Sequence, residues 1–535
     1  MALVAAGAIL GACESVPPPP LGTVGHVQGF QGRLAADEPY SVQVGQEVLS
    51  AGGTAADAAV AMYFSTAVTL PSRASLGGGG VCVVHDNPTQ QTEVLEFVPR
   101  VSADGAAGNP VPVAVPGNPR GMFALHSRFG RLLWEQLLAP AERLARDGHT
   151  VSKPLAQDLL IAARLLLKDP ESSQVFARDG EILREGDVLS QPDLGVLLSE
   201  LRTRGPGEFY EGMLAPALVR RFAEAAGTTD GAVTIDDLRD YQPEWRDSVS
   251  VAYGEDRHLH FAPAPAAAGP MAAQMWVMLG LDERYEETPE EERGHLFAEV
   301  SMRAFADRGR WLDASGESVV SGEEVASEER ARELMASFDP EQHTAAQDLT
   351  PAPVAFPENP AATSFVVVDR EGSAVACVYT MNNLFGLGRT VRDAGIVLAM
   401  APAKGSGTTA LLPMLMVNES TGEFLFAAAA SGGAAAPTAL TTVAAQTLIG
   451  EEGLEDAIDA KRLHHSGLPD TVLHEAGESE ERLLALTTRG HSVFEIESLG
   501  LVNAVYCPKG LPGNGSSCEA WTDPRGSGSV LDTDD

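Results

Sequence analysis

A threonine at the head of an apolar strand is the first candidate for chemistry in this chain. Thr363 follows two alanines and precedes the run Phe365–Val368, while residues 348–361 contain four prolines and predict an extended, exposed linker. A threonine hydroxyl is a weak nucleophile unless a base lies beside it, and cutting the chain before the threonine frees an α-amine that can act as that base. The segment therefore has the linker and the strand that such a mechanism needs.

Backbone amides that stabilise an oxyanion are the second requirement of that mechanism, and Ser431-Gly432-Gly433 is a possible donor turn.

Two sequence patterns that could indicate other enzyme classes are weaker. Gly77–Gly80 is followed by a strand pattern and lacks a lysine placed to reach a phosphate, so it predicts a tight turn rather than a nucleotide site. No serine lies in a G-x-S-x-G elbow, so the best signal of an α/β-hydrolase triad is missing.

The histidines and cysteines do not show the spacing of a metal site. His464 and His465 are adjacent, so their side chains point apart on a helix or a strand, and we expect a structural role. Cys82 and Cys377 lie in strand patterns and are interpreted as buried apolar residues. Cys507 and Cys518 flank a flexible loop that an oxidising compartment could close, which the sequence leaves open. The sequence predicts no metal and no cofactor.

The pattern of elements predicts a layered α/β protein. Residues 45–70 carry alanines and large apolar residues at helical spacing and predict a buried helix pair. Hairpins are predicted around 79–98, 363–380 and 411–430, and the region from about 113 to 348 is mostly helical. Strand hairpins inside and helices outside favour mainly antiparallel sheets covered by helices.

Charge and the N-terminal segment limit the partners. The net charge of -37 argues against nucleic acid, because a phosphate-binding surface needs clustered lysine and arginine. Residues 1–22 join a short apolar run to Leu10-Gly11-Ala12-Cys13 and a proline-rich tether. This quartet resembles a bacterial lipobox, which implies cleavage before Cys13 and acylation of its thiol. We therefore expect a lipid anchor at Cys13 as the only membrane contact, and a location on the periplasmic side of a bacterial cell envelope. A simple cleaved signal and a chance apolar start are the alternatives.

Several long segments resemble the gamma-glutamyltransferase family of N-terminal-nucleophile hydrolases. The segments, in chain order, are "GGTAADAAVA", "LGGGGVCVV", "VAVPGNPRGMFALHSRFGRLLWEQLLAPAERLARDG", "TSFVVVDREGSAVACVYTMNNLFGLG", "ASGG", "RLHHSGLPD" and "TDPRG". The resemblance implies a four-layer αββα sandwich made from one precursor that cuts itself. Residues 23–361 then correspond to the large subunit and residues 362–535 to the small subunit, intertwined in one domain.

The resemblance also implies roles for individual residues. In the family, the new N-terminal threonine attacks a gamma-glutamyl amide, and water or an amino acid resolves the acyl-enzyme. Thr380 and Asn382 match positions that support the nucleophile and the substrate, and Gly432 and Gly433 match the oxyanion glycines. Arg100 is the best match to the arginine that binds the substrate carboxylate, although strict register places Val98 there. The expected partner is a small molecule or a peptide.

Three departures from the family pattern concern the same site. In the family the nucleophile stands seven residues before the aspartate that closes the strand, which is Asp369 here, and that count reaches Ala362 instead of Thr363. Because strand side chains alternate, Thr363 would then face the wrong side unless a bulge shifts it. The segment 399–402 lacks a carboxylate for an α-amine, and residues 409–410 replace a serine pair.

Two main hypotheses follow, with a purely structural envelope protein of another fold as a third class. The first is an active acyltransferase or amidohydrolase that uses Thr363 on an altered substrate. The second is a silent homologue that keeps the fold and binds a ligand without turnover, because an alanine at the nucleophile position cannot attack an amide. The residues favour the second hypothesis.

Overall fold

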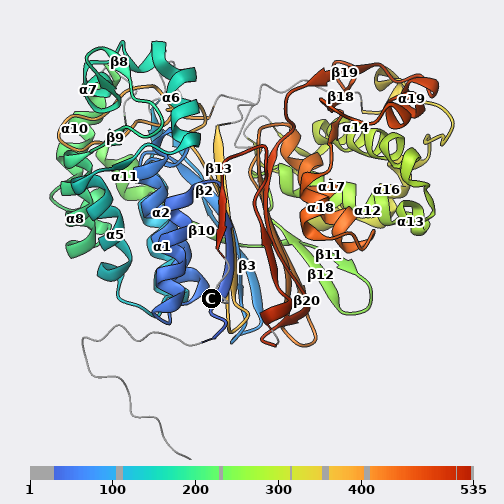
Figure 1. Ribbon diagram of the computed structural model, residues 1–535, viewed down its shortest axis with the longest axis horizontal. Coiled ribbons are helices and arrows are strands. Elements are labelled where there is room, and N and C mark those ends of the chain that lie inside the picture. Colours follow the sequence, from blue (N-terminus) through green and yellow to red (C-terminus); the bar gives the residue numbers. More distant parts are fainter. Residues whose placement is uncertain are drawn as a thin grey trace, which may run out of the picture.

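Two β-sheets stack face to face, and helices cover the outer face of each (Figure 1). The computed structural model describes residues 29–103, 113–227, 233–313, 316–351, 361–402, 410–513 and 515–531. The four layers confirm the predicted αββα sandwich, and the strand pairs within both large sheets are antiparallel, as expected.

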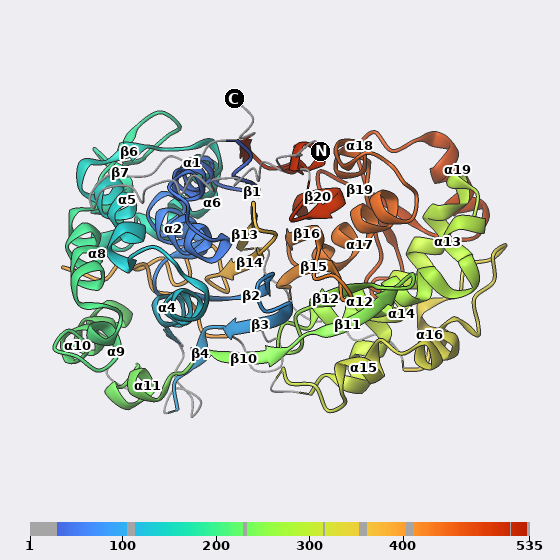
Figure 2. The same ribbon diagram turned by 90° about the horizontal axis from the view of Figure 1, so that it is seen from below.

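The first sheet has strands from both halves of the chain, seven in all. In spatial order they are β10 (Glu244–Asp247), β3 (Gln91–Phe97), β2 (Gly79–Asp86), β14 (Ala374–Thr380), β13 (Ala362–Asp369), β1 (Gly32–Ala36) and β22 (Ser529–Leu531). The predicted hairpins β2–β3 and β13–β14 are both present. Because β13 lies between β14 and β1, the strand that carries Thr363 is internal to the sheet (Figure 2).

The second sheet has six strands. They are β11 (Val249–Tyr253), β12 (Arg257–Phe261), β15 (Leu412–Asn418), β16 (Phe424–Ser431), β20 (Leu501–Leu511) and β21 (Glu519–Trp521). A smaller sheet contains β17 (Leu463–His464), β18 (Val472–Glu475) and β19 (Val493–Ile496), and three strand pairs complete the described set: β4 (Arg100–Val101) with β5 (Ala114–Val115), β6 (His149–Thr150) with β9 (Val188–Leu189), and β7 (Ala177–Arg178) with β8 (Glu181–Ile182).

The helices on the first sheet's side include the predicted buried pair. They are α1 (Pro39–Ser50), α2 (Ala55–Thr69), α3 (Pro71–Ala74), α4 (Asn118–Phe129), α5 (Trp134–Asp147), α6 (Lys153–Leu166), α7 (Pro170–Phe176), α8 (Pro192–Arg204), α9 (Gly207–Tyr210), α10 (Ala215–Ala226) and α11 (Ile235–Asp240). Every residue of α2 is buried, which explains its many alanines, because small side chains let neighbouring elements approach closely. Thr54 and Asp57 cap its first turn reciprocally.

The helices on the second sheet's side come from two parts of the chain. They are α12 (Ala268–Gly280), α13 (Arg284–Glu287), α14 (Arg293–Trp311), α15 (Gly322–Val325), α16 (Glu328–Met335), α17 (Ala435–Leu448), α18 (Leu454–Asp459) and α19 (Glu480–Thr488). Short 3₁₀ turns lie at Leu281–Glu283, Glu290–Glu292, Ala346–Asp348 and Gly515–Ser517. In the part of the chain that the structure describes, no helix combines the length and the apolar character needed to cross a membrane.

The alternation of side chains along β13 assigns each residue to a layer. Phe365 and Val367 belong to the apolar cluster between the first sheet and its helices. Val366 and Val368 belong to the cluster between the two sheets. The strand is therefore buried on both faces, and the face of each side chain follows from its number.

The cysteines differ in part from the expectation. Cys82 and Cys377 are buried, as predicted, but they are directly opposite each other on β2 and β14 and form a disulfide, with Cα atoms 4.1 Å apart. Their pairing was missed because 295 residues separate them in the sequence. Cys507 and Cys518 form the second disulfide, which the sequence had left open. Cys13 lies outside the described residues.

Candidate functional site

The first residues of β13 pair with the last residues of β14 in continuous register. Ala362 lies opposite Thr380, Thr363 lies opposite Tyr379, and the pairing continues to Val368 without a shift. A bulge, which would have been needed to turn Thr363, is therefore not part of this pairing. Ala362 belongs to the cluster between the sheets, and Thr363 faces the helix side because it alternates with Ala362.

The Thr363 hydroxyl donates a hydrogen bond to the buried carboxylate of Asp37. The Thr363 Oγ1 to Asp37 Oδ2 distance is 3.1 Å, and the same oxygen accepts the Ser364 N–H at 2.8 Å. The side-chain amide of Asn503 donates to Asp37 Oδ1 at 2.7 Å. Burial raises the pKa of Asp37, although these donors oppose the shift. No local pattern predicts this group, because Asp37, Ser364 and Asn503 belong to three distant segments.

Thr380 and Asn382 lie beside the peptide that precedes Ala362. The Thr380 hydroxyl donates to the Ala361 carbonyl at 3.0 Å and accepts the Asn382 N–H at 2.9 Å. The Asn382 side chain donates to the Met400 carbonyl at 2.8 Å. These two predicted residues are therefore together at the entrance of β13.

The two glycines lie between the end of β16 and α17. Gly432 and Gly433 have φ values of +116° and +69°, which glycine adopts most easily. A Cβ on Gly432 would stand 2.6 Å from the Cα of Gly500, so the close approach of the chains also requires glycine here. Ser431, just before them, is fully buried, and its hydroxyl has no hydrogen-bond partner among the described residues. By alternation with Ala429 it faces the space between the sheets.

The guanidinium of Arg100 is occupied by contacts within the protein. Its guanidinium pairs with Glu244 at 2.7 Å and Glu96 at 3.7 Å and lies over the ring of Tyr241. Val98, in contrast, belongs to the same buried cluster as Ala362. Arg73 contacts the strand entrance instead: it donates to the Ala362 carbonyl at 3.4 Å and forms a two-pronged ion pair with Asp158. Sequence reasoning missed Arg73.

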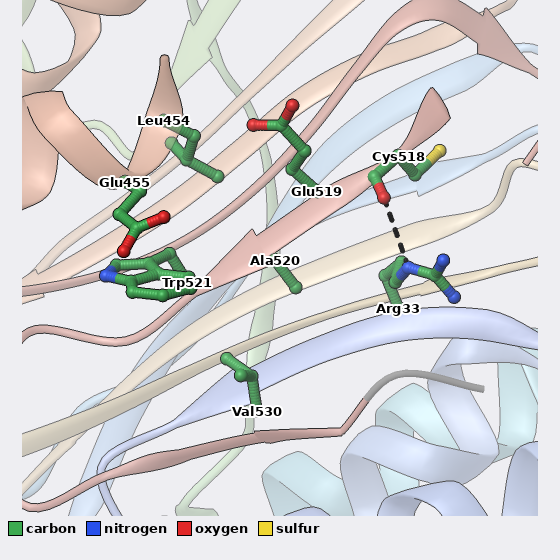
Figure 3. A pocket seen from close by; sticks show the side chains of 8 residues that line it. All are labelled: Arg33, Leu454, Glu455, Cys518, Glu519, Ala520, Trp521 and Val530. Atoms are coloured by element: carbon green, nitrogen blue, oxygen red, sulfur yellow. Dashed lines mark hydrogen bonds between the residues drawn. The ribbon is translucent and has the colours of Figure 1, made fainter. Parts of the chain in front are cut away.

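A cavity of about 390 Å³ opens elsewhere in the molecule (Figure 3). Arg33, Glu455, Glu519 and Trp521 are among its lining residues. Arg33 pairs with Val368, near the far end of β13 from Thr363. The cavity shares no lining residue with the strand entrance, so it is separate from the candidate site.

Glu38, next to Asp37, makes the stability of this region depend on pH. It caps α1 by accepting the Ser41 N–H at 3.1 Å, its other oxygen is buried without a partner among the described residues, and burial raises its pKa to about 7. Between its ordinary pKa of 4.5 and about 7, the folded state holds a proton that the unfolded state has lost. The contribution to the free energy of unfolding is therefore fully present below pH 4.5 and is lost as pH rises through 7.

We expect Glu38→Gln to remove this part of the pH dependence. Relative to wild type, the variant should gain about 2–3 kcal/mol in the free energy of unfolding between pH 5 and pH 8. Urea unfolding at both pH values measures the difference. Glu47→Gln, at an exposed position of the same helix, should show a constant offset. Parallel pH curves for Glu38→Gln and wild type would contradict the assignment.

Comparison with known proteins places this geometry in context. The profile of the family described as gamma-glutamyltranspeptidase matches residues 41–404 and 399–533. The chain is 26% identical to the glutathione hydrolase proenzyme of Escherichia coli, over 94% of each chain. It is 28% identical to that of Pseudomonas aeruginosa, over 93% of this chain and 94% of the relative. In fold it is similar to cephalosporin acylase from Bacillus halodurans, with a TM-score of 0.79 at 22% identity over 98% and 99% of the two chains.

Proposed function

We propose that this chain, which belongs to the gamma-glutamyltranspeptidase family, is a silent or strongly impaired member that binds a small molecule or peptide at the entrance of β13. The family acts on substrates such as glutathione by acyl transfer or amide hydrolysis. The proposal keeps the ligand class of the family and removes the covalent step.

The side chain at position 362 is the observation that carries the proposal. Ala362 is on the face of β13 that looks toward the second sheet, the space into which Ser431 of β16 also points, and a methyl group cannot attack an amide. Thr363 is on the opposite face, with its hydroxyl donated to Asp37. Loss of a covalent nucleophile lowers the rate on the order of 10⁶-fold in a serine enzyme, so its neighbours cannot compensate.

The surroundings also disfavour a glutamyl head group. Arg100 is paired with Glu244 and Glu96, and the apolar Val98 takes the place that strict register gives to the arginine. At Met400 and Ala401 no carboxylate is available for an α-amine. Each polar group of a glutamyl moiety left unpaired would cost about 1–3 kcal/mol. We infer that the natural ligand is less polar at this end than a gamma-glutamyl group.

The number of chains in the purified protein tests the proposal. We expect one uncut chain that contains both Ala361 and Ala362. Denaturing gel electrophoresis and intact-mass spectrometry would measure this. Two chains, with the smaller beginning at Ala362 or Thr363, would contradict it. A folded control of the same preparation, verified by circular dichroism, ensures that an uncut chain is not a misfolded one.

The contact between Thr363 and Asp37 favours the alternative, an active enzyme that uses Thr363. A carboxylate 3.1 Å from a hydroxyl is within reach to accept its proton. Under this alternative the smaller chain begins at Thr363, and Asp37→Asn abolishes activity without changing the fold. The buried Asp37 also accepts the Ser364 and Asn503 donors, which a purely structural role explains equally well.

We further propose that the protein is anchored on the periplasmic side of a cell envelope through Cys13. The Leu10–Cys13 quartet supports this proposal. The same intact-mass measurement, made on protein extracted with detergent, would reveal a chain that begins at an acylated Cys13. An unmodified Cys13 would contradict the anchor.

A further inference from the structure

A group of histidines and carboxylates lies in the helical layer on the second sheet, away from the strand entrance. His295 and Glu299 stand four residues apart on one face of α14, and His491 follows α19 (Figure 1). Three more residues surround them: His343, His465 and Asp470. The sequence predicted no metal site because these residues come from separate segments, none of which has the spacing of a metal motif by itself.

We propose that His295, Glu299 and His491 form a binding site for a divalent transition-metal ion of the Zn²⁺ class. One donor atom from each residue lies within 4.8 Å of the other two. His295 Nδ1 is 2.8 Å from His491 Nε2, which is 3.8 Å from Glu299 Oε1. Ligands of a tetrahedral zinc ion, with bonds of about 2.0–2.1 Å, stand about 3.3 Å apart. Two of the three spacings are therefore within about half an ångström of the value that the ion requires, and the third is at most 4.8 Å.

The protons of the two imidazoles are compatible with metal binding. His295 Nε2 must donate to the Asp339 carbonyl at 2.9 Å, so in a neutral ring its Nδ1 is bare. Burial lowers the pKa of both His295 and His491, that of His491 to about 3. His491 then donates from Nε2 to His295, which leaves its own Nδ1 bare, and this buried nitrogen has no hydrogen-bond partner among the described residues. If the single proton of His491 moves from Nε2 to Nδ1, His295 Nδ1 and His491 Nε2 each have a free lone pair for the ion. Neither ring loses a proton overall.

The carboxylate of Glu299 is ionised and held in place. Burial alone would raise its pKa, but the hydrogen bond from His343 and the charge of Arg303 lower it to about 2. Glu299 Oε1 accepts from His343 Nδ1 at 2.7 Å and from the Thr344 N–H at 3.1 Å. Metal-binding carboxylates and imidazoles are commonly oriented by such outer hydrogen bonds, and the Asp339 carbonyl does the same for His295.

His465 and His343 do not serve as ligands in this arrangement. His465 Nδ1 accepts the Gly467 N–H at 2.9 Å, so its Nε2 carries the proton that it donates to Asp470. Both nitrogens of His343 face carboxylates, Glu299 and Asp470, so both carry protons. His464 points away from the group and contacts Thr438, which agrees with the expectation that the adjacent histidines diverge.

A surface cavity provides access to His295. It has a volume of about 360 Å³, and its lining includes His295 and Phe338. Three carboxylates and one arginine also line it: Asp282, Glu287, Glu292 and Arg284. An acidic opening raises the local concentration of cations. Two imidazole donors favour Zn²⁺, Co²⁺ or Ni²⁺ over Mg²⁺ or Ca²⁺, which prefer oxygen ligands.

Metal titration of the full chain, prepared without an affinity tag and treated with a chelator, tests the proposal. We expect about one Zn²⁺ per chain after gel filtration, a higher Tm with Zn²⁺, and no competition by Mg²⁺. Co²⁺ should give the visible absorption of a four-coordinate ion. His491→Gln removes a ligand and should weaken Zn²⁺ binding by more than the roughly 10- to 100-fold that the loss of an outer hydrogen-bond partner costs. His258→Gln removes a partly exposed histidine next to Glu419, outside the group, and should leave the affinity unchanged.

Three results would overturn the proposal. The first is the absence of stoichiometric Zn²⁺ binding by the wild-type chain. The second is a Co²⁺ spectrum like that of the hydrated ion, which is measured on wild type and does not depend on whether His491→Gln folds. The third is an equal affinity in wild type and a folded His491→Gln variant. None of these results bears on the proposal that Ala362 makes the protein silent, because Ala362 is not part of this group.

Discussion

The variant Ala362→Thr will cut its own chain before residue 362, whereas the wild-type chain stays intact. The side chain at this position faces the second sheet, and the resemblance to the family places the nucleophile at this position, seven residues before Asp369. Thr380 already donates to the Ala361 carbonyl, which belongs to the peptide to be cut. After cleavage the freed α-amine can serve as the base.

The expected gain in cleavage rate is large, because removing the covalent nucleophile of a serine enzyme lowers its rate on the order of 10⁶-fold. Cleavage is followed by denaturing gel and N-terminal sequencing of the smaller fragment. Hydrolysis of a gamma-glutamyl amide should remain weak even in the cut variant, because Arg100 is paired with Glu244 and Met400 offers no carboxylate.

The matched control is Ala362→Val, which has nearly the shape of threonine without the hydroxyl. It should fold as well as Ala362→Thr and remain uncut, which separates the chemical effect from crowding at a buried position. Combining Ala362→Thr with Thr363→Ala should leave cleavage intact. A folded Ala362→Thr variant that stays uncut would show that more than the nucleophile has been lost.

The variant Asp523→Ala will lose about 3–5 kcal/mol of the free energy of unfolding, the usual cost of breaking a buried ion pair. Asp523 pairs with Arg462 at 2.7 Å, and both side chains are 1% exposed. It also accepts from Arg525 and from the Val502 N–H at 2.9 Å. Removing it leaves Arg462 buried without its counter-charge and frees a backbone donor of β20.

Urea unfolding at neutral pH measures this loss. Asp236→Ala is the matched control, because it also removes an aspartate from an arginine, but the Asp236–Arg239 pair is 79% and 54% exposed. Exposed pairs contribute about 0–1 kcal/mol, so the control should change little. Equal effects in the two variants would mean that the Arg462 network is more hydrated than its burial indicates.

The position of this network connects it to the candidate site. Arg462 donates to the Gly500 carbonyl at 3.1 Å, and Gly500 is the residue against which Gly432 packs. The segment "TDPRG" therefore supports the glycine turn indirectly, by holding β20 next to it. Its first residue, Thr522, also donates to Asn503 Oδ1 at 2.7 Å, and Asn503 donates to Asp37.

Local patterns in the sequence were sufficient for much of the fold. The helix pair at 45–70 and the hairpins β2–β3, β13–β14 and β15–β16 are formed by neighbouring residues, so periodicity and turn residues determine them. The layer of each side chain on β13 also follows from strict alternation. For this reason the placement of Ala362 and Thr363 on opposite faces was predictable once the register was known.

Contacts between distant segments could only be decided by the tertiary structure. The Cys82–Cys377 disulfide joins strands 295 residues apart, and the Thr363 hydroxyl donates a hydrogen bond to Asp37. The guanidinium of Arg100 is occupied by its ion pairs, so its charge is not available to a ligand. The group around Glu299 likewise unites separate helices and loops. Which elements form, and how their side chains alternate, depends on neighbouring residues, so local sequence patterns are enough to predict both. Which distant side chains meet depends on how the layers stack, and that is decided only when the whole chain has packed.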